Sequence, residues 1–128
     1  MNYKVIARGE PGVKGGGKRK FYASIAFNGE VTIDDMVKDI EKFSSLSEPD
    51  IRGVIVALEN VIQEKLADSK IVRMEKLGTF YPAIGSEASE KAEGVTAKSI
   101  KRVSVNYKAG KRILDTMKNK GFKKVEVK

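Results

Sequence analysis

The chain has 128 residues, enough for one domain with a modest core, and its 25 Lys and Arg outnumber 17 Asp and Glu to give a formal net charge of +8. It contains no Cys and no His, so disulfides, thiolate nucleophiles, the commonest general base and the usual zinc ligands are excluded. No apolar run has the length of a signal-peptide core or a membrane span. We therefore expect a cytoplasmic protein that is not an enzyme, takes no small-molecule substrate, metal or cofactor, and does not enter a membrane.

The first 31 residues predict two short strands joined by a loop. Residues 3–8 and 21–27 are rich in β-branched and aromatic side chains, and residues 9–20 between them hold glycines, Pro11 and basic side chains. We expect these two strands to pair. Gly15-Gly16-Gly17-Lys18 lacks the upstream glycine and the following Ser or Thr of a phosphate-binding P-loop, so we interpret it as a flexible loop.

Two helices are expected next. Thr32 is a suitable N-cap with Asp35 three residues later, and apolar residues at helical spacing predict a helix over 33–44. Ser47 then caps a second helix over 49–67, with Pro49 in its first turn. A continuous apolar stripe runs along this second helix and is either ordinary core or the seam of a dimer: Ile51, Val54, Ile55, Leu58, Val61, Ile62 and Leu66.

A strand is predicted over 71–81, with Gly78 as either a bend or a close backbone approach, and Pro82 begins either a loop or an edge strand. Residues 85–94 are polar and acidic. Residues 95–107 predict a basic strand. We expect this strand to pair as a hairpin with the preceding strand, which carries Arg73 and Lys76.

The chain then ends in a short helix and a final strand. The helix is expected over 110–119 and is ended by Gly121, and the strand is expected over 122–127. We find no internal repeat and no domain boundary, so the chain is interpreted as a single domain over 1–128.

Charge is segregated along the chain. Residues 1–31 carry six basic and two acidic side chains, residues 32–94 carry eight and thirteen, and residues 95–128 carry eleven and two. Segregation of this kind produces one positive face, which suits a polyanion such as nucleic acid. The other interpretation of the last quarter is a solvated lysine-rich tail.

The order helix, turn, helix, strand, long hairpin, strand, short helix is similar to that of the bacterial histone-like HU and integration-host-factor family. Leu77-Gly78-Thr79-Phe80 resembles the glycine–any–Phe segment that opens that family's sheet. Asn106-Tyr107-Lys108-Ala109-Gly110-Lys111 resembles the family's aromatic–Lys–Pro–Gly–Lys segment before its last helix, with Ala109 in the proline's place. The resemblance covers residues 32–119, and the segments 1–31 and 120–128 resemble the extensions of a longer HU-related branch.

The resemblance implies an α+β fold with a helix-turn-helix dimerisation base, a β-sheet saddle and a hairpin arm, to which the N-terminal strands are added. It also implies an intertwined homodimer, associated with the nucleoid, that binds double-stranded DNA through its phosphates with little sequence preference. The residues expected at the dimer interface are Ile51, Ile55, Leu58, Ile62 and Phe80. The residues expected to contact DNA are the basic side chains on or beside the saddle: Arg73, Lys76, Lys98, Lys101, Arg102, Lys108, Lys111 and Arg112.

The hairpin tip departs from the family's pattern. Arms of that family are rich in Arg and carry a tip proline that wedges between base steps. Residues 85–94 contain neither Pro nor Arg and hold three Glu against one Lys, and carboxylates repel phosphates. We therefore expect no intercalation, and either a short arm or a tip that meets something other than DNA. The further basic residues within 8–20 and 118–128 either widen the positive surface or bridge two duplexes.

Two other functions remain open at this point. An RNA-binding module would need exposed aromatic platforms, for which Tyr22, Tyr81 and Tyr107 are the candidates. A protein-interaction or structural dimer with the HU fold and little DNA bending would explain the acidic tip, but the basic last quarter opposes it.

Overall fold

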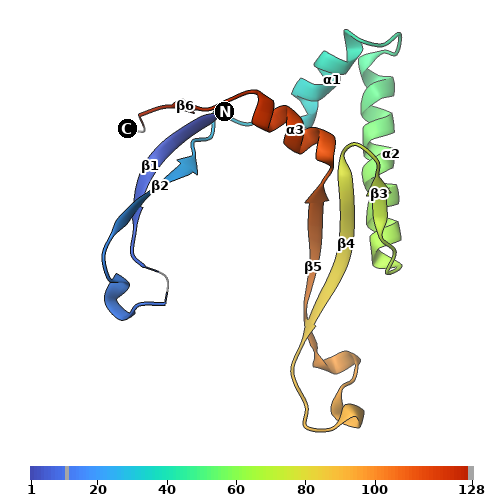
Figure 1. The fold of residues 1–128 in the computed structure, drawn as a ribbon. Coiled ribbons are helices and arrows are strands. Elements are labelled where there is room, and N and C mark those ends of the chain that lie inside the picture. Colours follow the sequence, from blue (N-terminus) through green and yellow to red (C-terminus); the bar gives the residue numbers. More distant parts are fainter. Residues whose placement is uncertain (11, 127–128) are drawn as a thin grey trace. The chain divides into compact units, whose positions relative to one another are not determined.

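The computed structural model describes residues 1–10 and 12–126, and it divides into two compact units (Figure 1). The first unit joins Met1–Val31 to the C-terminal segment that begins at Asp115, and the second unit is Thr32–Leu114. The described residues form three α-helices and two three-stranded sheets, so the expected mixed α+β class is confirmed. A single domain divided into 1–31, 32–119 and 120–128 remains a prediction, and the structure groups the first of these segments with the last.

The first unit is built on a sheet of strand order β2–β1–β6. β1 (Asn2–Arg8) pairs antiparallel with β2 (Lys20–Ile25), which confirms the predicted pairing. β6 (Lys123–Lys124) pairs parallel with the start of β1, where the Lys123 amide donates to the Met1 carbonyl at 2.8 Å. A 3-10 turn over Lys14–Gly16 lies in the loop between β1 and β2. The predicted strand over 122–127 is shorter than expected because it pairs only with the start of β1, and Val127 lies outside the described residues.

Both helices that open the second unit begin at the predicted caps. α1 (Ile33–Glu41) follows Thr32, whose hydroxyl accepts from the Asp35 amide, while the Asp35 carboxylate accepts from the Thr32 amide at 3.0 Å. The hydrogen bonds from the Thr32 amide and hydroxyl hold the pKa of Asp35 below its usual range because they favour the charged carboxylate. α2 (Glu48–Ala67) follows Ser47, whose hydroxyl accepts from the Asp50 amide.

The two helices pack against each other, and an ion pair between Arg52 and Asp34 joins them. α1 ends at Glu41, three residues before the predicted end at 44. The chain turns there because the Phe43 amide donates to the Ile40 carbonyl at 2.9 Å. This bond spans three residues, as in a 3-10 turn, instead of the four residues of an α-helix.

The second sheet has the order β3–β4–β5 and is antiparallel throughout. β3 (Val72–Met74) and β4 (Gly78–Ser86) replace the single strand predicted over 71–81, and that prediction was wrong. The chain reverses between them, with Glu75 in the left-handed region at φ 36° and the Leu77 amide donating to the Met74 carbonyl at 2.8 Å. Glu is not a residue type that favours such a turn, so the sequence pattern did not predict it.

β4 and β5 (Ile100–Ala109) form the long hairpin that extends beyond β3 in Figure 1. Pro82 lies within β4 without breaking the sheet, because β3 pairs with β4 only as far as Phe80 and leaves an open edge beyond it. β5 begins five residues later than predicted, since two 3-10 turns, Ala92–Gly94 and Ala97–Ser99, occupy the tip of the hairpin. α3 (Lys111–Asn119) follows β5 and ends before Gly121, which has φ 76°.

The segments that carry the family resemblance meet in space. A Cβ on Gly78 would overlap the Lys108 carbonyl oxygen, and a Cβ on Gly110 would overlap the Lys76 carbonyl oxygen. The Tyr107 hydroxyl donates to the Leu77 carbonyl at 2.6 Å across the same junction. The end of β5 is thereby held against the turn between β3 and β4, and this contact sets the register of the sheet.

The Gly110→Ala variant is expected to lose about 1–3 kcal/mol of unfolding free energy because its methyl group would have to displace backbone. Gly53→Ala is the matched control, since a Cβ at Gly53 in α2 meets nothing and alanine favours a helix by about 0.8–1 kcal/mol over glycine. Urea denaturation followed by circular dichroism measures both. A Gly110→Ala variant as stable as the wild type would contradict the close approach of β5 to the turn.

Candidate nucleic-acid interface

The sheet β3–β4–β5 has one apolar face, identified by its strand register. Phe80 lies between Val72 on one side and Tyr107 on the other, and the Phe80 and Tyr107 ring centroids are 5.1 Å apart. Farther along the hairpin, the same face carries Pro82 opposite Val105 and Ile84 opposite Val103. Because paired residues share a face and neighbours alternate, all the intervening residues point to the other side.

That other side is polar and basic, and we call it the basic sheet face. Thr79 of β4 lies between Arg73 of β3 and Lys108 of β5 in one row across the sheet. The following rows pair hydroxyl, amide and small side chains and end on a third cation: Tyr81 with Asn106, Ala83 with Ser104, and Gly85 with Arg102. No carboxylate occupies any of these positions, and Arg73, Arg102 and Lys108 form no ion pair with any described residue.

Helix α2 leaves the basic sheet face open. It contacts β3 and β4, where Val72, Met74 and Phe80 are half-buried whereas Arg73 is exposed. This pattern of burial places the helix against the apolar face. The three cations of the opposite face are therefore available to a partner.

The spacing of the three cations suits an extended polyanion. Arg73 and Lys108 flank a single strand, so their Cα atoms are about 10 Å apart, and six residues along β5 separate Lys108 from Arg102 by about 20 Å. Arg102 lies back over the sheet, because a Cβ on Gly85 would be 3.0 Å from its terminal nitrogen. Each strand of a DNA duplex carries one charge per ~3.4 Å of axis, so cations at these separations face several phosphates at once.

The remaining predicted contact residues lie around this face rather than on it. Lys76 is in the turn between β3 and β4, Lys98 is in the 3-10 turn Ala97–Ser99 at the hairpin tip, and Lys111 and Arg112 begin α3. Lys101 is the unpaired residue of the bulge between Ile100 and Arg102, so strand alternation assigns it to neither face. The prediction that Arg73 and Lys76 lie on the strand that pairs with β5 was wrong, because β4 is that partner and β3 lies on its far side.

Sequence reasoning missed the uncharged members of the basic sheet face, which are Thr79, Tyr81, Ser104 and Asn106. A signal for two of them was present, since residues 102–108 alternate polar and apolar side chains in the pattern Arg-Val-Ser-Val-Asn-Tyr-Lys. Thr79 and Tyr81 had no comparable signal because Pro82 and Ala83 interrupt the alternation on β4.

The hairpin tip is ordered by its own hydrogen bonds. The Glu87 amide donates to the Ser99 carbonyl at 2.9 Å, and the Thr96 amide donates to the Ser99 hydroxyl at 3.1 Å. Glu87, Glu90 and Glu93 all lie in this segment, and the nearest proline, Pro82, is in the middle of β4. The tip thus presents carboxylates and no wedge side chain of the proline type.

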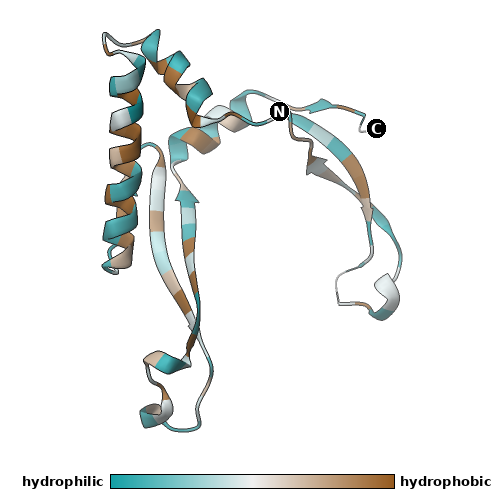
Figure 2. Cartoon of the chain, turned by 180° about the vertical axis from the view of Figure 1, so that it is seen from behind, coloured by the Kyte–Doolittle hydropathy of each residue, from teal (hydrophilic) through white to brown (hydrophobic). Residues whose placement is uncertain are grey.

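The expected dimer residues are divided between the interior and the surface of the chain. Ile51 is 3% exposed and belongs to the subunit's own core, whereas Ile55, Ile62 and Phe80 are half-buried. Leu58 is 43% exposed and lies on one helical stripe with Val54 at 61% and Val61 at 49% (Figure 2 shows the hydropathy of α2). The exposed edge of the stripe is a face that this chain does not cover.

Two other kinds of feature are absent from the part of the chain that the structure describes. No group of Asp and Glu side chains there could hold a metal ion. No described helix is long and apolar enough to cross a membrane.

The described residues thus form a mixed α+β fold of three helices and two small sheets, with a basic face on its long hairpin. The chain belongs to the HU-HIG family, described as an HU domain fused to a winged helix-turn-helix, immunoglobulin-like or glycine-rich motif, which it matches over residues 1–124. Its fold is similar to that of a protein from Bacteroides vulgatus ATCC 8482. The crystal structure of that protein is described, by inference, as that of a bacterial DNA-binding protein. That likeness has a TM-score of 0.65 at 11% identity and covers 97% of this chain but 47% of the other, so the chain spans about half of that protein's length. No curated protein matches the sequence.

Proposed function

We propose that this protein binds double-stranded DNA through its phosphate backbone, with little sequence preference, and acts as an architectural protein of the nucleoid. The observation that carries the proposal is the basic sheet face, where Arg73, Arg102 and Lys108 share one side of the sheet and no carboxylate occupies a paired position between them. Membership of an HU-type family and the description of the similar Bacteroides vulgatus protein support the same partner. Of the uncharged side chains between the cations, Tyr81, Ser104 and Asn106 can donate further hydrogen bonds to phosphate oxygens, whereas Thr79 is buried at 9% exposure.

The test is duplex binding at several salt concentrations, with two duplexes of unrelated sequence. The logarithm of the affinity is expected to fall linearly with the logarithm of salt concentration, with a slope of about −0.9 for each phosphate contacted. The two duplexes should differ by less than about threefold, since phosphate contacts carry no base information. Affinity that is independent of salt, or a strong preference for one sequence, would contradict binding through the backbone.

We further propose that the protein acts as a homodimer. Among the described residues, the buried apolar side chains are Ala26, Val37 and Ile51, which is a very small core for the length of the chain. The exposed stripe of Val54, Leu58 and Val61 on α2 offers a second copy the apolar surface that the core lacks. The half-buried Ile55 and Ile62 border this stripe and extend the interface toward the interior of the subunit.

The hairpin tip is proposed to stay out of the base stack, so the protein bends DNA little. Replacement of Glu87, Glu90 and Glu93 by Gln is expected to raise duplex affinity several-fold, because each change removes a charge that repels phosphate. Anisotropy measures the affinity, and energy transfer between the labelled ends of a duplex measures the bend. A large bend that disappears on deletion of residues 88–98 would overturn this account of the tip.

The acidic tip is also the one feature that favours a second candidate function, a protein-interaction dimer that retains the HU fold. If the protein has that function, the wild type would bind duplex DNA weakly even at low salt. Replacement of Glu87, Glu90 and Glu93 by Gln would leave this affinity unchanged. The salt titration and the tip variants therefore separate the two functions.

A further inference from the structure

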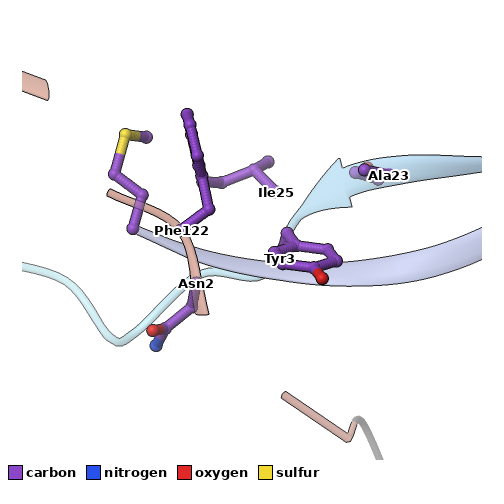
Figure 3. Close-up of a pocket in the computed structure, with 7 residues that line it drawn as sticks. Asn2, Tyr3, Ala23, Ile25 and Phe122 are labelled. Atoms are coloured by element: carbon purple, nitrogen blue, oxygen red, sulfur yellow. The ribbon is translucent and has the colours of Figure 1, made fainter. Parts of the chain in front are cut away.

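The sheet of the first unit has two chemically different faces. The register pairs Tyr3 with Ile25, Val5 with Ala23 and Ala7 with Phe21, so these side chains form one apolar face. In Figure 3, Phe122 and Ile25 point the same way on this side while Asn2 points away from them. The alternate positions therefore belong to the opposite face of the sheet.

That opposite face is basic, and we call it the basic N-terminal face. It carries Lys4 and Arg8 of β1, Lys20 of β2 and Lys123 of β6. Six residues separate the row of Asn2 and Lys123 from the row of Arg8 and Lys20, so the cations extend over about 20 Å. The uncharged residues between them are Asn2, Ser24, a half-buried Ile6 and a 42%-exposed Tyr22, and Lys4 is itself half-buried.

The cations of this face have no internal partners. None of Lys4, Arg8, Lys20 and Lys123 forms an ion pair with any described residue. The nearest carboxylate in sequence, Glu10, has its side chain beside Gly17, where a Cβ would be 2.8 Å from a carboxylate oxygen. The positive charge of the face is thus left without internal neutralisation.

One pair on this face opposes the stability of the sheet. Arg8 lies directly opposite Lys20, and like charges in directly opposite positions of an antiparallel pair are destabilising. A bound polyanion would remove the repulsion. Apart from Ile6, the face carries Lys and Arg among Asn, Ser and Tyr, as the basic sheet face of the second unit does.

We propose that the basic N-terminal face is a second binding surface for the phosphate backbone of duplex DNA, separate from the basic sheet face. Nucleic acid fits better than an anionic membrane because the exposed apolar side chains, such as Phe21 and Phe122, belong to the opposite side of the sheet. Each chain would then hold DNA at two surfaces. This inference goes beyond the proposed function and does not depend on the basic sheet face.

Lys123 and Lys124 provide a matched test, since they are neighbours in β6 but pair with Asn2 and Tyr3 on opposite faces. Lys123→Glu is expected to weaken duplex binding at least several-fold and to lower the salt slope, whereas Lys124→Glu changes both much less. Equal effects of the two variants, or no effect of either, would overturn the proposal.

A second experiment isolates the surface in the full-length chain. In a background of Arg73→Glu, Arg102→Glu and Lys108→Glu, residual salt-dependent duplex binding is expected, and adding Lys4→Glu and Arg8→Glu should abolish it. Arg8→Glu creates an opposite-charge pair with Lys20, so the unfolding temperature should not fall, and lost binding would not reflect unfolding.

The outcomes of this experiment are distinguishable from failure of the proposed function. Absence of residual binding, or residual binding unaffected by Lys4→Glu and Arg8→Glu, overturns the second surface. If the triple background binds as the wild type does and the added changes abolish binding, the second surface stands and the basic sheet face fails. Phosphatidylserine vesicles serve as a further probe. If Lys4→Glu and Arg8→Glu abolished binding to these vesicles but left duplex binding intact, the assignment of the face to DNA would be overturned.

Discussion

Reversing Arg73 and Lys108 to Glu together is expected to lower duplex affinity at least about a hundredfold at moderate salt. The two side chains flank Thr79 in a single row of the basic sheet face, so the double variant turns both ends of that row from positive to negative. In a homodimer, four phosphate contacts would be lost, and the salt slope should become shallower by about 0.9 for each. Fluorescence anisotropy across a salt series measures both quantities.

The control for this variant carries the same change in net charge elsewhere. Lys38→Glu and Lys65→Glu place the two reversals on α1 and α2, outside the sheet. This control should lose far less affinity, since only long-range attraction is weakened and salt screens it. If both double variants lost affinity equally, net charge rather than the basic sheet face would account for binding.

Neighbouring residues of β5 refine the same test. Arg102 has a paired position on the basic sheet face, whereas Lys101 is the unpaired residue of the bulge beside it. Arg102→Glu should therefore weaken binding more than Lys101→Glu. The opposite order would show that Lys101, rather than Arg102, is the main contact at this end of the hairpin.

Val54→Glu combined with Leu58→Glu is expected to convert the protein to a monomer. Both side chains are exposed in the single chain, so the carboxylates remain in water in a monomer but would be buried unpaired in a dimer. Burial of two such charges per subunit costs several kcal/mol, enough to raise the dissociation constant by at least a thousandfold. Sedimentation velocity measures the mass over a range of concentrations.

Asn60→Glu and Gln63→Glu are the control pair on the same helix. These residues are exposed and lie outside the apolar stripe, so the variant should remain dimeric. Duplex affinity should fall in the stripe variant because half of the contacts are lost with the second subunit, and it should change little in the control. A stripe variant that stays dimeric at micromolar concentration would show that α2 is not the interface.

Local chemistry made the helices predictable from the sequence. Thr32 and Ser47 cap their helices within three residues, and both starts agree with the structure to within one residue. The pairing of β1 with β2 was also predictable, because two strand-like segments flank a loop rich in glycine. The break at residues 75–77 was not, since Glu75 takes a left-handed conformation that its residue type disfavours.

The identity of the charges was plain in the sequence, but their grouping was not. Lys101 and Arg102 are adjacent in the chain, yet only Arg102 has a paired position on the basic sheet face, whereas Arg73 and Lys108 are far apart in the chain and share one row. Likewise, Arg8 and Lys20 lie at opposite ends of a loop in the sequence, and they are directly opposite each other on the paired strands β1 and β2. No local pattern contains this information.

Composition, caps and alternation therefore established a basic, mixed α+β protein with a helical pair and a charged hairpin, because each of these properties depends on residues a few positions apart. The arrangement of cations into two basic faces came from strand register. Register depends on contacts between distant segments, such as the close approach of Gly78 to Lys108 and of Gly110 to Lys76, which the folded chain alone brings together.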